Sequence, residues 1–213
     1  MSDSDLIPPH GGYKKLVTYR LGNLIYDATT AFCARYLDRK DRTYDQMVQA
    51  ARSGVANIIE GSEASATSKK TELKLTNVAK ASQEELLADY QAFLRQHALP
   101  EWQSDSPQVQ LIRQTRPETL DELRQLMAVL VSDMSDQLAT AQRSADGSDP
   151  SDKSDKSDKS DIKLTVACNT MITLINQETY LLARQITKLG ASFEQEGGFT
   201  ERLYRVRSAK RQK

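Results

Sequence analysis

The sequence predicts an all-α protein whose body is an antiparallel four-helix bundle. Apolar residues recur at three- and four-residue steps through most of the 213 residues, and this is the period of an amphipathic helix. No segment shows the strict alternation that is typical of a strand. The first three periodic segments are joined by short connections, which place consecutive helices side by side in opposite directions.

Residues 13–100 are predicted to form the first three helices of the bundle. The first spans about 13–37 and the second about 43–61. The third follows a stretch of small polar residues at 62–68 and runs to about residue 97.

The second helix carries three local signals. Thr43 can cap it, with Gln46 three residues on completing a capping box. Gly54 lies inside it, where glycine costs about 1 kcal/mol relative to alanine, so we expect a neighbouring helix to approach closely there. Gly61 is expected to end the helix in the left-handed conformation.

Residues 101–143 are predicted to be an inserted segment. Its helix is capped within 115–118 and holds apolar residues between Leu120 and Met134, packed at the periphery of the bundle. Residues 144–161 repeat Ser-Asp-Lys and offer nothing to bury, so they are expected to form a flexible linker. The clustered aspartates lack the glycine and glutamate spacing of a calcium loop of the EF-hand type.

The fourth bundle helix is predicted at 162–196 and is stopped by Gly197 and Gly198. Its apolar face is wider than one neighbour can cover, so it is either central in the bundle or shared with another subunit. A short basic suffix follows at 197–213, and residues 1–12 are expected to be disordered.

Charge is unevenly distributed along the chain. The totals are 29 basic and 29 acidic side chains. Residues 13–97 carry 13 basic and 10 acidic side chains, 98–161 carry 7 and 13, and 199–213 carry 6 and 1. A neutral total therefore conceals a basic body and a basic tail, which are compatible with binding a polyanion.

The sequence contains few of the residue types and motifs that usually carry catalysis. His10 and His97 are the only histidines, and Cys33 and Cys168 are isolated cysteines expected to be free thiols in the core. Phosphate-binding glycine loops, G-x-S-x-G and H-E-x-x-H are absent from the sequence. We therefore expect no enzyme activity, metal or cofactor. No apolar run reaches the ~18 residues of a membrane helix, and we expect residence in the cytoplasm.

Two glutamates stand out. Glu60 precedes Gly61 at an expected helix end, where the helix dipole disfavours negative charge, so a partner such as Arg52 or Lys69 is expected. Glu178 interrupts the apolar face of the last helix. Both are interpreted as buried or interfacial hydrogen-bonded groups that fix helix register.

Basic residues are the better functional candidates, because arginine and lysine contact phosphates and a nearby tyrosine can stack on an exposed base. The candidate nucleic-acid-binding residues lie on the first and third helices and in the tail: Lys14, Lys15, Arg20, Arg35, Arg39, Lys69, Lys70, Lys74, Arg202, Arg205, Arg207, Lys210 and Arg211.

The segment from Ala51 to Gly61, with its Asn57-Ile-Ile-Glu60-Gly61 ending, resembles the hallmark of a bacterial four-helix-bundle family, and Lys70–Leu94 resembles that family's next helix. The family includes proteins encoded in intervening sequences of large-subunit ribosomal RNA genes and the accessory variability determinant of diversity-generating retroelements. The run from Phe193 through Gly197 and Gly198 to Arg202 resembles a variant with a suffix after the bundle.

This resemblance implies a non-enzymatic bundle that assembles as a homopentameric ring. In the retroelement branch it implies binding to a reverse transcriptase and to RNA or DNA through basic surfaces. Two alternatives remain open: a protein-interaction scaffold that does not bind nucleic acid, and a small-molecule or metal enzyme, for which Asn57, Glu60, Glu178 and Gln185 are the only polar residues that could converge inside the bundle.

Overall fold

The computed structural model describes residues 12–145 and 152–197, together with the isolated positions 201, 203, 204, 207, 208 and 211. These residues form six α-helices and one 3-10 turn, without a strand among them, so the all-α prediction is confirmed. The elements are η2 (Tyr13–Lys15), α1 (Val17–Tyr36), α2 (Arg42–Ala64), α3 (Lys69–Gln96), α4 (Pro107–Thr115), α5 (Leu120–Ala145) and α6 (Asp152–Glu196).

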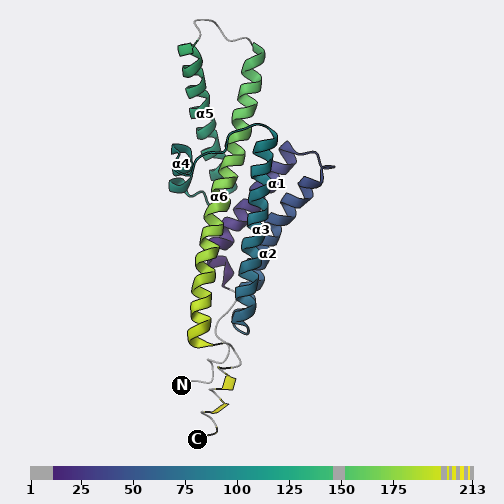
Figure 1. Cartoon of the computed structure of the whole chain (residues 1–213), viewed down its shortest axis with the longest axis vertical. Helices are drawn as coiled ribbons and strands as arrows, with labels where there is room; N and C mark the ends of the chain where they lie inside the picture. The colour runs from purple at the N-terminus through teal and green to yellow at the C-terminus, as the bar shows by residue number, and fades with distance from the viewer. Residues whose placement is uncertain are drawn as a thin grey trace.

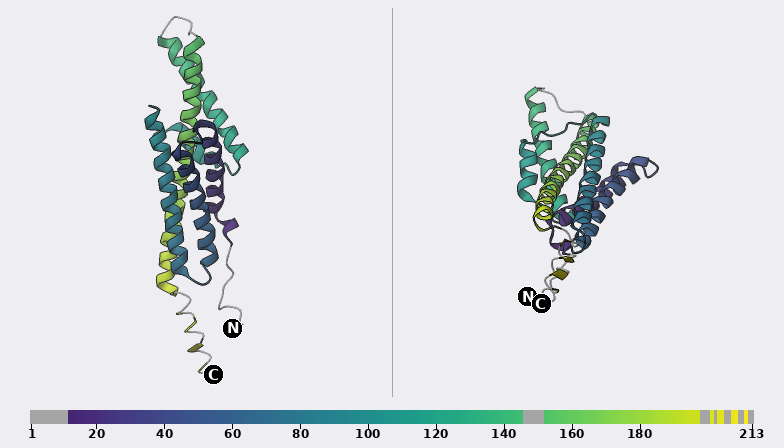
Figure 2. Two further views of the ribbon diagram at one scale, coloured as in Figure 1. Left: turned by 90° about the vertical axis from the view of Figure 1, so that its right-hand side faces the viewer. Right: turned by 60° about the horizontal axis from the view of Figure 1, so that its bottom comes forward.

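Helices α1, α2, α3 and α6 pack together as a bundle. Each contacts two of the others, in the order α1, α2, α3, α6 and back to α1. Consecutive members run in opposite directions along the long axis (Figure 1). Two further views show that α5 and the first part of α6 project beyond the other three bundle helices (Figure 2).

Helix α2 corrects two local predictions. Its cap is Asp41, whose Oδ1 accepts from the Thr43 backbone N–H at 2.8 Å, and not Thr43 itself. Gly61 does not end the helix, which continues to Ala64. Gly61 is instead buried against α3, where an added Cβ would lie 3.4 Å from the Leu75 Cβ. A Cβ at Gly61 would therefore make only ordinary van der Waals contact. The space at Gly54 is filled by a side chain of the neighbouring helix and not by the predicted close approach of its backbone, because a Cβ there would overlap the Gln83 amide.

The inserted segment is two helices and belongs to the core. Leu123, Leu126 and Leu130 of α5 are buried in the same cluster as Ile112 of α4 and the α6 side chains around Val166. The prediction of one peripheral helix was wrong. Helix α6 is longer than the other bundle helices, and α4 and α5 bury the apolar side chains of its N-terminal half.

The predicted flexible linker is also corrected in part. Residues 152–161 form the first turns of α6, and residues 144 and 145 end α5, while 146–151 lie outside the described residues. The packed part of α6 supplies the costly helix nucleus.

The wide apolar face of α6 is covered within one chain, because α1, α3, α4 and α5 all pack on it. Of the two explanations offered by the sequence, the central position in a bundle accounts for this breadth. At the other end, Gly197 has the left-handed φ of +70°, and its N–H donates to the Phe193 carbonyl at 3.0 Å, as predicted for the stop. Gly198 lies outside the described residues.

A side-chain clamp holds the insert to α6. Asn169 is buried, its Oδ1 accepts from the Trp102 backbone N–H at 2.7 Å, and its Nδ2 donates to the carbonyls of Pro100 and Thr165 at 2.9 and 3.0 Å. The connection from α3 to α4 is therefore fixed to α6 by two hydrogen bonds with one residue, and the third bond, to Thr165, stays within α6.

One level of the bundle is polar rather than apolar. We call Gly22, Gly54, Gln83 and Glu178 the polar layer, one residue from each bundle helix. A Cβ added to Gly22 would lie 2.6 Å from the Glu178 Oε1 and 3.3 Å from Val55, the neighbour of Gly54 in α2. The two glycines thus leave the space that the two long side chains fill.

The layer separates two apolar clusters. One helical turn away on one side lie Ile58, Ala79 and Leu182, which form a small cluster of their own. One turn away on the other side, residues such as Leu86 and Ile175 belong to the main cluster. Gln83 and Glu178 are both fully buried, and none of their four side-chain polar atoms has a hydrogen-bond partner.

Candidate nucleic-acid interface

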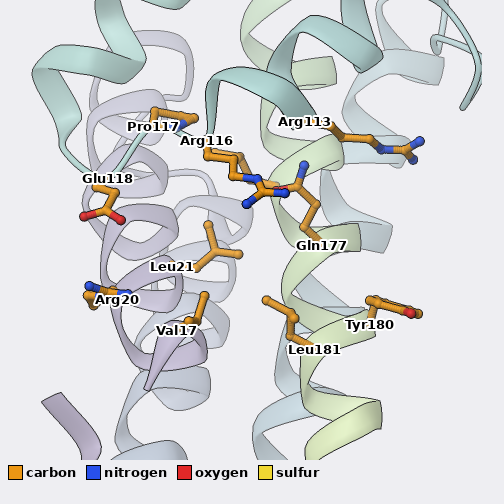
Figure 3. Close-up of a pocket in the computed structure, with 11 residues that line it drawn as sticks. Val17, Arg20, Leu21, Arg113, Arg116, Pro117, Glu118, Gln177, Tyr180 and Leu181 are labelled. Carbon is orange, nitrogen blue, oxygen red and sulfur yellow. The ribbon is translucent and has the colours of Figure 1, made fainter. Parts of the chain in front are cut away.

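A groove of about 580 Å³ lies between α1, α6 and the turn that joins α4 to α5 (Figure 3). We call it the arginine groove, because Arg20, Arg113 and Arg116 line it, against the single acid Glu118. The remaining lining is mainly apolar and comes from the two bundle helices and the turn: Val17, Leu21, Pro117, Leu174, Gln177, Tyr180 and Leu181. Its formal charge is therefore +2 over an apolar base.

The α4–α5 turn positions two of the arginines. Arg116 has φ +49°, a left-handed conformation in which its N–H still donates to the Ile112 carbonyl at 3.2 Å. The buried Pro117 that follows cannot continue a helix. The turn thereby directs the Arg116 side chain into the space between α1 and α6, beside Gln177 (Figure 3).

Arg113 is held one turn earlier on α4. Its Nη1 donates to the Ser104 carbonyl at 3.0 Å, which leaves the other guanidinium donors of this exposed side chain available. Arg20 lies on the α1 side of the groove (Figure 3). All three guanidinium groups are therefore accessible to an anion.

Helix α6 contributes an exposed aromatic ring. Tyr180 is 62% exposed, and the Arg184 guanidinium lies 5.9 Å from its ring centroid on the next turn. Below the groove, the Thr18 hydroxyl donates to the Gln185 Oε1 at 3.2 Å and ties α1 to α6. The groove thus presents cations and a stacking surface on a rigid base.

The structure does not gather the predicted basic residues into one site. Arg20 lies in the arginine groove, whereas Arg35 lines a second groove near the other end of α1. Arg39, after α1, stands over the Tyr44 ring at 6.0 Å.

A second group lies toward the end of the bundle at which α3 begins and α6 ends (Figure 1), and η2, packed on α1 and α2, carries two of its lysines. Lys69 there donates to the Ser192 Oγ at 2.6 Å, which joins α3 to α6. The exposed lysines of this end are Lys14, Lys15, Lys70 and Lys74. Arg207 and Arg211 of the tail are exposed, and Arg202, Arg205 and Lys210 lie outside the described residues.

The polar residues proposed for an interior enzyme site do not converge. Glu60 is exposed, so its predicted burial was wrong, because it lies on the solvent side of an α2 that continues past Gly61, and its interfacial pairing stays a prediction. Asn57 Nδ2 bonds within α2, to the Ser53 carbonyl at 2.8 Å. Glu178 is buried as predicted, but without the hydrogen bond that was expected. Burial raises its pKa well above the ordinary value of 4.5.

The two cysteines are free and buried, as predicted. Burial raises the pKa of each thiol to about 12, with the nearby Asp89 charge adding to the effect at Cys33. Neither thiol is therefore ionised at neutral pH, and neither is a reactive nucleophile.

Sequence reasoning missed Arg113, Arg116 and Tyr180. The two arginines fall in a segment whose summed charge is acidic, and Tyr180 lies directly before Leu181 and Leu182 in the apolar pattern of the last helix. The local signal was the Arg-x-x-Arg-Pro run, in which two cations one helical turn apart precede a helix-terminating proline.

Within the described part of the chain, no three His, Cys, Asp or Glu side chains are grouped as metal ligands would be. None of the described helices is long and apolar enough to cross a membrane. Comparison with protein-family models, curated proteins and solved structures gave no match.

Proposed function

We propose that this protein is a non-enzymatic helical-bundle accessory protein that binds nucleic acid, with the arginine groove as its principal contact. The observation that carries the proposal is that Arg20, Arg113 and Arg116, from two separate parts of the chain, all line one largely apolar groove beside an exposed tyrosine. Arginine forks match phosphate oxygens in a bidentate way.

The apolar base of the arginine groove favours a nucleic-acid strand over a small anion as its ligand. A small anion needs only the guanidinium groups, whereas a strand also presents base faces that stack on Tyr180 or pack on Leu21 and Leu181. Lys14 and Lys15 of η2, which precede α1, extend the positive surface toward the basic end of the bundle.

The test measures the anisotropy of fluorescein-labelled single-stranded RNA and DNA titrated with the full chain at several salt concentrations. Three phosphate contacts predict that log K falls with log salt at a slope of about −2 for a single strand. Arg20→Gln combined with Arg116→Asn should reduce the magnitude of this slope by about 1.4. Asparagine is chosen at 116 because it tolerates the left-handed conformation.

The matched control is Arg52→Gln combined with Arg95→Gln, which removes two equally exposed arginines outside the groove. If the control lowers affinity as much as the groove variant, the effect is non-specific charge and the groove is not the site. If the wild-type chain does not bind at low salt, the nucleic-acid proposal fails and the interaction-scaffold alternative gains support.

The family resemblance extends the proposal to partners. It implies self-assembly into a pentameric ring and, in the retroelement branch, association with a reverse transcriptase. Light scattering coupled to size-exclusion chromatography tests the first part directly. A monomer at micromolar concentration would remove the ring from the proposal while leaving nucleic-acid binding to be judged by the anisotropy experiment.

A further inference from the structure

A second groove, of about 570 Å³, lies on the other half of α1 and is bounded by three helices. Helix α1 forms one wall, α5 forms the other, and α6 forms the base. Since α1 and α5 make little contact with each other, the space between them is a trough that opens on the base helix. We call it the three-helix trough.

The trough is apolar inside. Its walls and base include Ala31 and Phe32 from α1, Met127 and Val131 from α5, and Ala167 and Met171 from α6. Small alanines leave room for an incoming side chain, and methionines adapt their shape to it. This is the surface that receives the apolar face of an amphipathic helix in helix-in-groove recognition.

The rim of the trough is positively charged on all three helices. Arg35 comes from α1, Arg124 from α5 and Lys163 from α6, and no acidic residue is among the residues that line the trough. Arg124 is partly neutralised by Asp121, whose Oδ1 it meets at 2.9 Å. The other two cations therefore dominate the field that a partner would meet.

From the apolar base and the cationic rim, we infer that the three-helix trough docks an acidic amphipathic helix of a protein partner. The leucine-type face of such a helix would enter between α1 and α5, and its flanking carboxylates would meet Arg35 and Lys163. This site is separate from the arginine groove and shares no lining residue with it.

A nucleic-acid strand fits the trough less well. Phe32 is buried and the Tyr36 ring is half-buried, whereas Tyr180 beside the arginine groove is 62% exposed, so the trough presents less aromatic surface for base stacking than the groove does. The base of the trough is aliphatic and sulfur-containing, which suits leucine side chains better than bases.

The test uses a fluorescein-labelled four-turn synthetic peptide with leucines on one helical face and glutamates elsewhere. Two control peptides carry lysines in place of the glutamates, or the same residues with the leucine face scrambled. The acidic amphipathic peptide should bind the full chain saturably. Each control peptide should bind at least about tenfold more weakly, equivalent to 1.4 kcal/mol.

Two variants of the chain locate the binding. Ala31→Trp fills the trough from α1, and Arg35→Glu combined with Lys163→Glu reverses its rim. Each should weaken peptide binding at least about tenfold, and Ala31→Trp should leave RNA binding by the arginine groove in place. The matched controls are Ala88→Trp on α3 and Arg52→Glu combined with Arg95→Glu on α2 and α3, exposed positions outside the trough.

Circular dichroism checks that Ala31→Trp folds. If it does not fold, the rim variant, whose two substitutions are at exposed positions, still decides the test. Absence of peptide binding to the wild-type chain overturns the inference, as does equal binding by the trough variants. Displacement of the peptide by single-stranded RNA that persists in the Arg20/Arg116 variant would overturn the inference and reassign the trough to nucleic acid. Loss of RNA binding in the Arg20/Arg116 variant, with peptide binding intact, would separate the two surfaces.

Discussion

Glu178 gives the sharpest stability prediction, because its carboxyl group is fully buried with both oxygens unpartnered. The groups facing it from α1 and α2 are Gly22 and Val55, and the polar layer adds Gln83 from α3, none of them charged. Burial is the cause of the raised pKa. The folded state therefore keeps Glu178 protonated at pH values where the unfolded chain has released that proton.

The sign of the effect follows from linkage. Above the ordinary pKa of 4.5, the unfolded state is ionised while the folded state is not, so the free energy of unfolding falls as pH rises. The slope is about −1.4 kcal/mol per pH unit until the folded-state pKa is reached. Below 4.5 the carboxyl is neutral in both states, and the term vanishes.

The perturbation is Glu178→Gln, which keeps the shape and removes the titration. Urea unfolding followed by circular dichroism at pH 5, 6 and 7 should show the variant gaining about 1.4 kcal/mol per pH unit relative to the wild type. Other carboxyl groups titrate alike in both proteins and cancel in this difference. Glu60→Gln, at an exposed position, is the control and should give a flat difference.

A wild-type and Glu178→Gln pair with parallel stability curves from pH 5 to 7 would refute the reasoning. It would mean that Glu178 ionises in the folded state near its ordinary pKa, which requires solvent or a charged partner within the polar layer.

Three further substitutions test the packing. Gly54→Ala should lower the free energy of unfolding by about 1 kcal/mol by crowding Gln83, but should raise it in a Gln83→Ala background, measured as a double-mutant cycle. Asn169→Ala should cost about 2–3 kcal/mol in urea unfolding, because the Trp102 N–H and its companion carbonyls lose their partner; a loss below 0.5 kcal/mol would contradict this. Gly197→Ala should cost about 1 kcal/mol because of its positive φ, and an unchanged unfolding midpoint would show that the helix end frays freely.

The bundle could be predicted because its helices repeat an apolar period over many turns, as α1 and α3 do. Glycine was harder to interpret, since one residue type serves both to end helices and to let them approach. At Gly197 the first use holds, whereas Gly54 makes room for the Gln83 side chain of the neighbouring helix and Gly61 does not end its helix. Choosing between them requires knowing where the neighbouring helix runs, which is tertiary information.

Short or polar segments escaped prediction for a different reason. Helix α4 has nine residues, too few for its period to stand out. Its start was nevertheless marked by Ser106, whose Oγ accepts from the Val109 N–H at 3.4 Å, followed by Pro107 at the first helical position. In residues 152–161 the composition favours a linker, but continuity with the packed part of α6 makes the segment helical.

The arginine groove could not be predicted, because it depends on where the α4–α5 turn comes to rest on the bundle. Arg113 and Arg116 were hidden in a segment of net negative charge, and only the fold brings them opposite Arg20. A sum of charges along the sequence therefore says little about the local field at a surface assembled from distant segments.

The polar layer and the arginine groove lie on different faces of the same helical turns of α1 and α6. Leu21 and Gln177 line the groove, and their chain neighbours Gly22 and Glu178 point into the layer. A substitution that alters packing in the layer would therefore shift the groove walls, whereas Glu178→Gln conserves volume and should not. RNA affinity of this variant should equal that of the wild type at pH 7, while Gly22→Ala, which crowds Glu178, should weaken it. Equal affinity in both variants would show that the groove walls are held by their outward contacts, such as the Thr18–Gln185 hydrogen bond, independently of the layer behind them.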